Sequence, residues 1–248
     1  MKKPIWTQDY AVNSFLVTPQ KRLGIYALLN ILQDAAWNHA THLGHGYEET
    51  LAGKTAWVLT RQKVQMKSWP TWGESVSIRT WVRPLQGPFA TRDFEILHKD
   101  QIIGTSTTSW ILMDVESRAA VLGDLASLPF APRTDYRLPI DAKKIILNSP
   151  LEQRTSFEVR NTDLDMNEHV NNTRYVQWIL DSIPREWHRS YVLEEYDVNF
   201  LAETHAGDSV DILMSPENPE ASESFEVQFQ GQRNGKPVFT AQMRVKPV

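Results

Sequence analysis

Titratable and amide side chains are concentrated in residues 163–172, which read Asp-Leu-Asp-Met-Asn-Glu-His-Val-Asn-Asn. Within this run, Asp165, Asn167 and His169 occupy alternate positions. A carboxylate or an imidazole can take a proton from water, and a carboxamide can hold a polarised oxygen. Side chains at alternate positions of an extended segment face the same way, so these three are expected to converge on one pocket. Asp163 is expected to be a turn residue.

An amphipathic helix is predicted directly after this segment, over residues 172–183, and Pro184 would end it. The Asn171-Asn172 pair is a good helix N-cap, which leaves residues 165–169 in non-helical backbone. Backbone N–H groups at the start of such a helix could face an anionic oxygen. The helix and the strands around it must therefore position the polar segment.

Two stretches of the chain match each other without a gap. Residues 57–78 align with residues 191–212 at a constant offset of 134, and seven of these 22 positions are identical. Both stretches contain a Gly-acidic-Ser-Val sequence, which starts at Gly73 and at Gly207. A match of this length predicts a duplicated domain. The polar segment at residues 163–172 occurs only in the second copy.

Each copy is predicted to contain one long helix and about four antiparallel strands after it. The first helix is expected over residues 23–42, and residues 14–17 and 156–159 are aligned with each other in front of the two helices. Hairpin turns are predicted at Asp100-Gln101 and Asn234-Gly235. The strands are expected at residues 56–69, 74–82, 90–98 and 102–113, and at 191–201, 209–214, 224–230 and 237–245. One helix against one face of such a sheet is an α+β design.

The domain boundaries follow from a stretch with no counterpart in the repeat. Residues 129–152 contain four prolines and are expected to be an extended connector. The predicted domains are therefore residues 1–128 and residues 153–248, and the second of them carries the polar segment.

Composition excludes several classes of protein. The net charge of −4 argues against a nucleic-acid partner, and the absence of cysteine excludes disulfides, thiolate metal sites and a cysteine nucleophile. No apolar stretch is long enough to span a bilayer, and the first residues lack the apolar run of a signal peptide, so a cytoplasmic protein is expected. No cofactor is expected. No metal site is expected either, because His39, His42 and His45 do not share one helical face.

The polar segment, together with Tyr175 and Trp178, resembles the core motif of the acyl-acyl carrier protein (acyl-ACP) thioesterases. The resemblance extends to Gln33-Asp34-Ala35-Ala36 and to residues 110–118, and so covers nearly the whole chain. It implies a tandem double hotdog fold, in which each half is an antiparallel sheet wrapped around one long helix. It also implies hydrolysis of fatty acyl-ACP to free fatty acid and carrier protein in fatty-acid biosynthesis.

The family motif implies a fourth catalytic residue besides Asp165, Asn167 and His169. In that motif a Glu precedes a Cys, and here Glu203 takes the Glu position and Thr204 the Cys position, with a one-residue insertion after them. Without a cysteine, the consistent mechanism is a carboxylate and an imidazole that activate water. The sequence leaves the general base open among Glu203, His169 and Asp165.

The resemblance also implies where the substrate binds. In members of the family, the first half of the chain contributes the acyl-chain site. The candidate lining residues therefore lie on the first helix and the strand after it: Tyr26, Leu29, Gln33, Trp37 and Trp57. The expected partner is acyl carrier protein, with Lys143-Lys144 among the candidate basic contacts, and the expected assembly is a monomer or a homodimer. The alternatives are an acyl-CoA thioesterase, a hotdog dehydratase and a non-catalytic acyl-thioester binding module.

Overall fold

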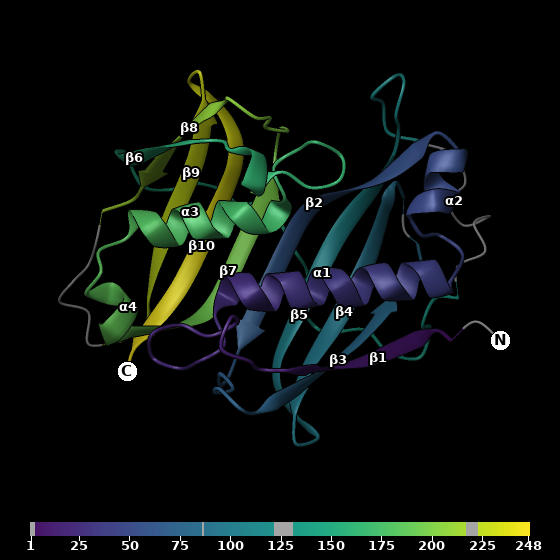
Figure 1. Cartoon of the computed structure of the whole chain (residues 1–248), viewed down its shortest axis with the longest axis horizontal. Coiled ribbons are helices and arrows are strands. Elements are labelled where there is room, and N and C mark those ends of the chain that lie inside the picture. The colour runs from purple at the N-terminus through teal and green to yellow at the C-terminus, as the bar shows by residue number, and fades with distance from the viewer. Residues whose placement is uncertain (1–2, 86, 122–130, 217–222) are drawn as a thin grey trace. The chain divides into compact units, whose positions relative to one another are not determined.

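The structure is a computed structural model that describes residues 3–85, 87–121, 131–216 and 223–248. The chain divides into two compact units, Met1–Ala142 and Lys143–Val248. In each unit one long helix lies across one face of an antiparallel sheet (Figure 1). The predicted α+β class is therefore confirmed within each unit.

The sheet of the first unit has the strand order β1-β3-β4-β5-β2. The long helix α1 (Ile25–His42) buries its apolar residues, which recur every three or four positions, while its other face is polar. A short helix, α2 (Tyr47–Ala52), follows it and was not predicted. The strands are β1 (Ile5–Ala11), β2 (Thr55–Met66), β3 (Ser75–Val82), β4 (Phe89–His98) and β5 (Gln101–Asp114).

The sheet of the second unit has the order β6-β8-β9-β10-β7. Its long helix is α3 (Asn172–Ser182), and a short helix α4 (Trp187–Ser190) follows. A single 3-10 turn, Asn161–Asp163, precedes the polar segment. The strands are β6 (Glu152–Glu158), β7 (Tyr191–Phe200), β8 (Ser209–Met214), β9 (Phe225–Arg233) and β10 (Lys236–Pro247).

The internal connectivity of the two units is the same. Counted from the first strand of each unit, both sheets have the order 1-3-4-5-2. A glycine with positive φ leads into the third strand of each, Gly73 at 87° and Gly207 at 82°. The N–H of Gly73 donates to Val12 O at 2.9 Å, and that of Gly207 donates to Val159 O at 3.0 Å. The duplication inferred from the sequence is confirmed.

One part of the predicted alignment is wrong. Val12 and Val159 are equivalent, so the two copies are offset by 147 residues before their helices and by 134 after them. Residues 14–17 are therefore not the counterpart of residues 156–159, and the first strand is β1. The offset changes because α1 is longer than α3 and is followed by the additional helix α2.

Both predicted hairpins are present, with one shift of position. Asn234 and Gly235 have φ values of 52° and 72°, as a two-residue type I′ turn requires. The other turn is centred on Lys99 and Asp100, with φ values of 48° and 62°, because Gln101 already pairs with His98. The turn was predicted one residue too far along the chain.

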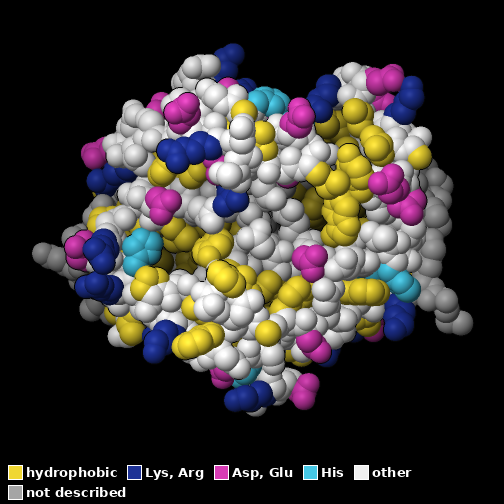
Figure 2. Space-filling model, viewed as in Figure 1, with side chains coloured by type: hydrophobic (Ala, Val, Ile, Leu, Met, Phe, Trp, Pro, Cys, Tyr) yellow, Lys and Arg dark blue, Asp and Glu magenta, His cyan; other side chains and the backbone are white. Residues whose placement is uncertain are grey.

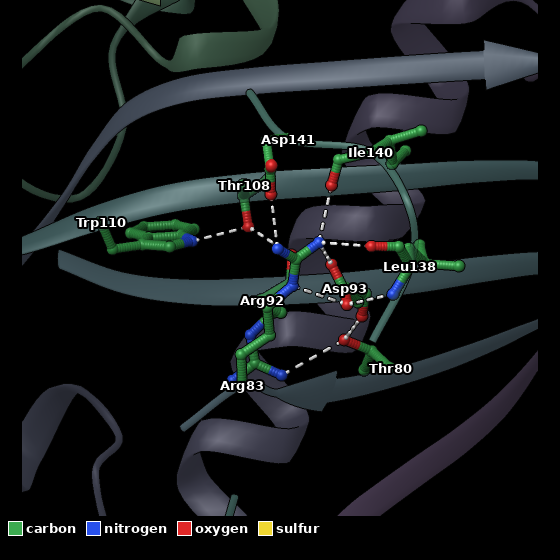
Figure 3. A network of polar contacts seen from close by, with 9 residues as sticks. All are labelled: Thr80, Arg83, Arg92, Asp93, Thr108, Trp110, Leu138, Ile140 and Asp141. Atoms are coloured by element: carbon green, nitrogen blue, oxygen red, sulfur yellow. Dashed lines mark hydrogen bonds and ion pairs between the residues drawn. The ribbon is translucent and has the colours of Figure 1, made fainter. Parts of the chain in front are cut away.

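A buried ion pair holds the first part of the predicted connector against the first unit (Figure 3). Arg83 binds both carboxylate oxygens of Asp93, through Nε and Nη2, each at 2.8 Å. The same guanidinium donates to Asp141 at 2.6 Å and to the carbonyls of Leu138 and Ile140. Asp93 also accepts the backbone N–H of Leu138 at 3.0 Å. Residues 138–141 are thus fastened to β4 by charged hydrogen bonds.

The second part of the connector is fastened to the second unit by buried amides. Asn199 accepts the N–H of Ile145 at 2.7 Å and donates to Lys143 O at 3.0 Å. Gln228 accepts the N–H of Asn148 at 2.9 Å. The division between the units therefore falls within the predicted connector, at Ala142/Lys143. The predicted boundary at residue 128 lies outside the described residues.

A buried histidine on α1 packs against a buried arginine from β4. His39 Nδ1 lies 2.8 Å from Arg92 Nη1, and His39 Nε2 lies 3.0 Å from the carbonyl of Lys3. Because Arg92 must donate, Nδ1 accepts and Nε2 carries the proton, which is the neutral imidazole. Burial, and next the charge of Arg92, lower the pKa of His39 from 6.5 to about 4.

This pKa predicts that acid destabilises the protein. Below pH 6.5 an unfolded His39 takes up a proton that the folded state refuses until about pH 4, so stability is lost as the pH falls through this window. From about pH 7 to about pH 5 the loss is about 2 kcal/mol. Denaturant unfolding at several pH values measures it. His39→Gln, which keeps an acceptor and a donor, should lose this part of the pH slope, and an unchanged slope would contradict the assignment.

Among the described residues, no helix combines the length and the apolar content needed to cross a membrane.

Candidate active site

Residues 164–170 form a tight loop in front of α3. Leu164 and Val170 pair as an isolated bridge, and the N–H of Asp165 donates to the carbonyl of His169 at 2.8 Å. The N–H of Glu168 returns to the carbonyl of Asp165 at 3.1 Å, which Glu168 permits by adopting a φ of 61°. The predicted non-helical backbone is confirmed, but the segment is a closed turn rather than an extended run.

The carboxylate of Asp165 is engaged within this loop. Its Oδ1 accepts the backbone N–H of Asn167 at 2.8 Å, which is an Asx turn. The side chain of Asn167 is exposed and that of Asp165 is half-buried. Asp165 therefore fixes the backbone that carries Asn167.

Glu203 reaches the loop from the segment after β7. The N–H of Val170 donates to the carbonyl of Thr204 at 2.9 Å, which joins the two backbones next to the site. His169 Nε2 then lies 3.5 Å from Glu203 Oε2, and the two side chains are 26% and 31% exposed. Of the four predicted catalytic side chains, these two are brought into contact, and both remain accessible to water.

Thr204 stands where the family motif has cysteine, but it has a structural role. It is fully buried, and its hydroxyl lies 2.7 Å from the hydroxyl of Tyr175 on α3. Burial raises the pKa of Tyr175 to about 12, and the charges of Glu203 and Asp165 add to the rise while Thr204 and Arg233 oppose it. A buried hydroxyl bound to a neutral phenol is not a nucleophile facing solvent.

The start of α3 is capped as predicted, with a consequence for anion binding. Asn171 Oδ1 accepts both the N–H and the hydroxyl of Thr173 at 3.0 Å. This N–H is therefore already bonded and does not face an anionic oxygen as proposed from the sequence. Asp163 is a turn residue as expected, since its carboxylate accepts the N–H of Arg160 at 2.9 Å.

The first unit contains an equivalent loop that lacks the four predicted catalytic residues. Val17 and Leu23 form the equivalent bridge, and Thr18 donates its N–H to the carbonyl of Arg22 at 2.8 Å. Lys21, with a φ of 60°, takes the place of Glu168, and the N–H of Leu23 donates to Pro70 O as that of Val170 does to Thr204 O. The positions equivalent to Asp165, Asn167, His169 and Glu203 hold Thr18, Gln20, Arg22 and Trp69.

A third donor lies beside the His169–Glu203 pair. The imidazole of His205 meets that of His169 edge to face, with ring centroids 4.9 Å apart. In the part of the chain that the structure describes, His169, Glu203 and His205 are the one group of three donors close enough to hold a metal ion. His205 was not among the site residues predicted from the sequence, although the one-residue insertion after Glu203 marks this position as a departure from the family motif.

The candidate acyl-binding residues lie in the first unit. Tyr26, Leu29, Gln33 and Trp37 follow one stripe of α1, and Trp57 lies on β2. Tyr26 donates its hydroxyl to the carbonyl of Phe15 at 3.0 Å, and Trp37, 44% exposed, stacks on Tyr47 at 6.0 Å. In Figure 2 apolar side chains gather at the end of the first unit that carries α2, whereas charges of both signs are scattered.

Two family models match this chain in sequence. The acyl-ACP thioesterase N-terminal domain matches residues 3–124, and the acyl-ACP thioesterase C-terminal domain matches residues 149–245. The chain belongs to the acyl-ACP thioesterase family. The family resemblance drawn from the sequence is confirmed.

Two plant proteins are among the curated relatives of this chain. The oleoyl-acyl carrier protein thioesterase of Coriandrum sativum is 30% identical over 232 residues, which cover 86% of this chain and 63% of that protein. The palmitoyl-acyl carrier protein thioesterase of Gossypium hirsutum is 29% identical over 217 residues, 79% of this chain and 50% of that protein. The chain thus spans less than two thirds of the length of these relatives.

Solved structures of the family confirm the double hotdog fold. An acyl-ACP thioesterase from Bacteroides thetaiotaomicron has a TM-score of 0.88 at 24% identity, covering 98% of both chains. The 12:0-ACP thioesterase from Umbellularia californica has a TM-score of 0.86 at 21% identity, covering all of this chain and 96% of that one.

Proposed function

We propose that this chain is a thioester hydrolase that cleaves fatty acyl-ACP to free fatty acid and carrier protein in fatty-acid biosynthesis. One observation carries the proposal: His169 Nε2 lies 3.5 Å from Glu203 Oε2, and the equivalent positions of the first unit hold Arg22 and Trp69 instead. The loop forms in the first unit without an imidazole or a carboxylate at these positions, so the fold itself does not require the His169–Glu203 pair. Membership of the acyl-ACP thioesterase family supports the same activity.

In the proposed reaction, the His169–Glu203 pair takes a proton from water as the oxygen attacks the thioester carbonyl carbon. The tetrahedral intermediate then collapses and the C–S bond breaks. The departing sulfur takes the proton that the pair holds, so the carrier leaves as a thiol. A thiol leaving group has a pKa of about 8.5, so it departs without a strong acid. A catalytic hydrogen bond that is long in the free enzyme commonly shortens when substrate binds.

Asn167 is proposed to stabilise the developing oxyanion through its side-chain amide. A donor with this role must be held in place before the reaction starts. The Asx turn supplies that order, because Asp165 Oδ1 binds the N–H of Asn167 at 2.8 Å. We therefore assign Asp165 to positioning rather than to proton transfer.

The acyl chain is proposed to bind in the first unit, at Tyr26, Leu29, Gln33, Trp37 and Trp57. The exposed Trp37, which stacks on Tyr47 of α2, and the exposed Leu51 of α2 support this assignment. Acyl carrier protein is the proposed partner, and the exposed Lys143-Lys144 pair offers it basic contacts. A cytoplasmic location and a monomer or homodimer remain part of the proposal; the plant relatives named above are chloroplastic.

A substrate panel tests the proposal. Purified protein is incubated with ACP and CoA thioesters of the same graded acyl lengths, and free acid and free thiol are both measured. We expect hydrolysis, with a higher kcat/KM for the ACP thioester at each length. Glu203→Gln is the matched control for contaminating hydrolases and should lose the activity.

The other outcomes of the panel each identify an alternative. Equal or faster cleavage of the CoA series would replace the proposal with an acyl-CoA thioesterase. Binding of acyl thioesters without release of acid or thiol would replace it with a non-catalytic binding module.

A further inference from the structure

The catalytic pair has a neighbour that the proposed hydrolysis does not use. Ring nitrogens of His169 and His205 and a carboxylate oxygen of Glu203 all lie within 4.8 Å of one another. Two imidazoles and one carboxylate are the ligands of many zinc sites that keep one position open. The chain has no cysteine, so a transition-metal site in it cannot use thiolate ligands, and imidazole nitrogens suit zinc well.

The backbone holds His205 at this place through its own turn. The N–H of His205 donates to Asp208 Oδ2 at 2.8 Å, and the N–H of Asp208 returns to the carbonyl of His205 at 3.1 Å. Asp208 is also paired with Arg233 from β9.

The turn itself does not require a histidine. In the first unit Thr71 occupies the equivalent position, with its N–H 2.7 Å from Glu74 Oε2 and its carbonyl 3.1 Å from the Glu74 N–H. The two turns have the same hydrogen bonds with different side chains. The imidazole of His205 is therefore free of any role in forming the turn, and it stands beside the His169–Glu203 pair.

The distances suit a small tetrahedral ion. Neighbouring ligand atoms around zinc are ~3.4 Å apart, given bonds of ~2.0 to 2.2 Å. His169 Nε2 and Glu203 Oε2 already lie 3.5 Å apart. His205 is exposed, so rotation of its imidazole can bring the third donor closer without moving the core.

We infer that His169, Glu203 and His205 form a binding site for Zn²⁺ or a similar divalent transition metal, and that an ion bound there blocks hydrolysis. The second part rests on the proposed function, because the ion would occupy the imidazole and the carboxylate that activate water. His205 then makes the enzyme sensitive to inhibition by the metal, while the reaction itself uses His169 and Glu203.

Zn²⁺ binding to metal-free protein tests the site without reference to activity. Competition with a chromophoric chelator should give one ion per chain for the wild type, and His205→Gln should weaken the affinity by at least ~10-fold. His98→Gln is the matched control, since His98 Nε2 lies 3.2 Å from Glu74 Oε1 but has no third donor among the described residues. It should bind Zn²⁺ as the wild type does.

Hydrolysis in the same buffer tests the blocking. The wild-type rate should fall with the Zn²⁺ concentration that fills the site and return when chelator is added. His205→Gln, compared with its own metal-free rate, should need at least ~10-fold more Zn²⁺ for the same inhibition. Equal Zn²⁺ affinity of wild type and His205→Gln would overturn the site, and a wild-type rate unchanged by bound Zn²⁺ would overturn the blocking.

The two proposals fail in different ways. If metal-free protein hydrolyses no thioester but loses Zn²⁺ affinity with His205→Gln, the site stands and the proposed function is wrong. If metal-free protein is active and Zn²⁺ affinity does not depend on His205, the function stands and the site is wrong.

Discussion

Replacing His169 by alanine is expected to lower kcat for acyl-ACP hydrolysis by about 10² to 10⁴-fold, the range of a general acid–base group. The reason is the contact of its Nε2 with Glu203 Oε2 at 3.5 Å. The equivalent positions of the first unit hold Arg22 and Trp69, which cannot replace this pair. Glu203→Gln is expected to have an effect of the same order. Single-turnover release of free acid measures both.

The pair should also behave as one unit. If His169 and Glu203 hold the proton together, the double variant should be about as slow as either single variant, because groups that act together are not additive. His188→Ala, an exposed histidine on α4, is the control and should keep wild-type kcat. Unchanged thermal unfolding of each variant is required. Near-wild-type turnover in His169→Ala would contradict the proposed mechanism, in which His169 and Glu203 activate water.

Asn167→Ala and Asp165→Ala should each lower hydrolysis by about 10²-fold or more, but for different reasons. Asn167 would lose the oxyanion donor itself. Asp165 would lose the acceptor for the Asn167 N–H, so Asp165→Asn, which keeps an oxygen at Oδ1, should retain more activity than Asp165→Ala. Equal loss in Asn and Ala variants would instead assign a catalytic charge to Asp165.

Replacing Asp93 by alanine is expected to destabilise the protein by about 3 to 5 kcal/mol, the cost of leaving a buried charge without its partner. Asp93 is fully buried and binds Arg83 through both oxygens at 2.8 Å (Figure 3). The Leu138 N–H would lose its acceptor as well. Denaturant unfolding measures the loss.

Two comparisons make this prediction specific. Asp135→Ala removes a carboxylate that is 73% exposed and paired with Arg133, and should change stability by less than about 1 kcal/mol. Arg83→Met combined with Asp93→Ala should cost less than the sum of the single changes, since no buried charge is left unpaired. Additive costs would mean that Arg83 and Asp93 stabilise the protein independently of each other.

The duplication was partly readable in the sequence. Identical residues persist at the offset of 134 because they form the turn at Gly73 and Gly207 and the buried faces of the paired strands. The equivalence of the loops at residues 17–23 and 164–170 could not be read. The offset there is 147, and these loops are held by backbone hydrogen bonds that different side chains permit.

The sequence by itself determined the local features of the site. The cap at Asn171, the non-helical backbone before it and the residue types for proton transfer follow from short-range chemistry, and family resemblance added Glu203. Tertiary structure decided what these residues contact: the Val170–Thr204 hydrogen bond sets Glu203 against His169, and the turn closed by Asp208 adds His205. Such contacts join segments more than 30 residues apart, and they depend on strand register and turn geometry rather than on the residues that meet.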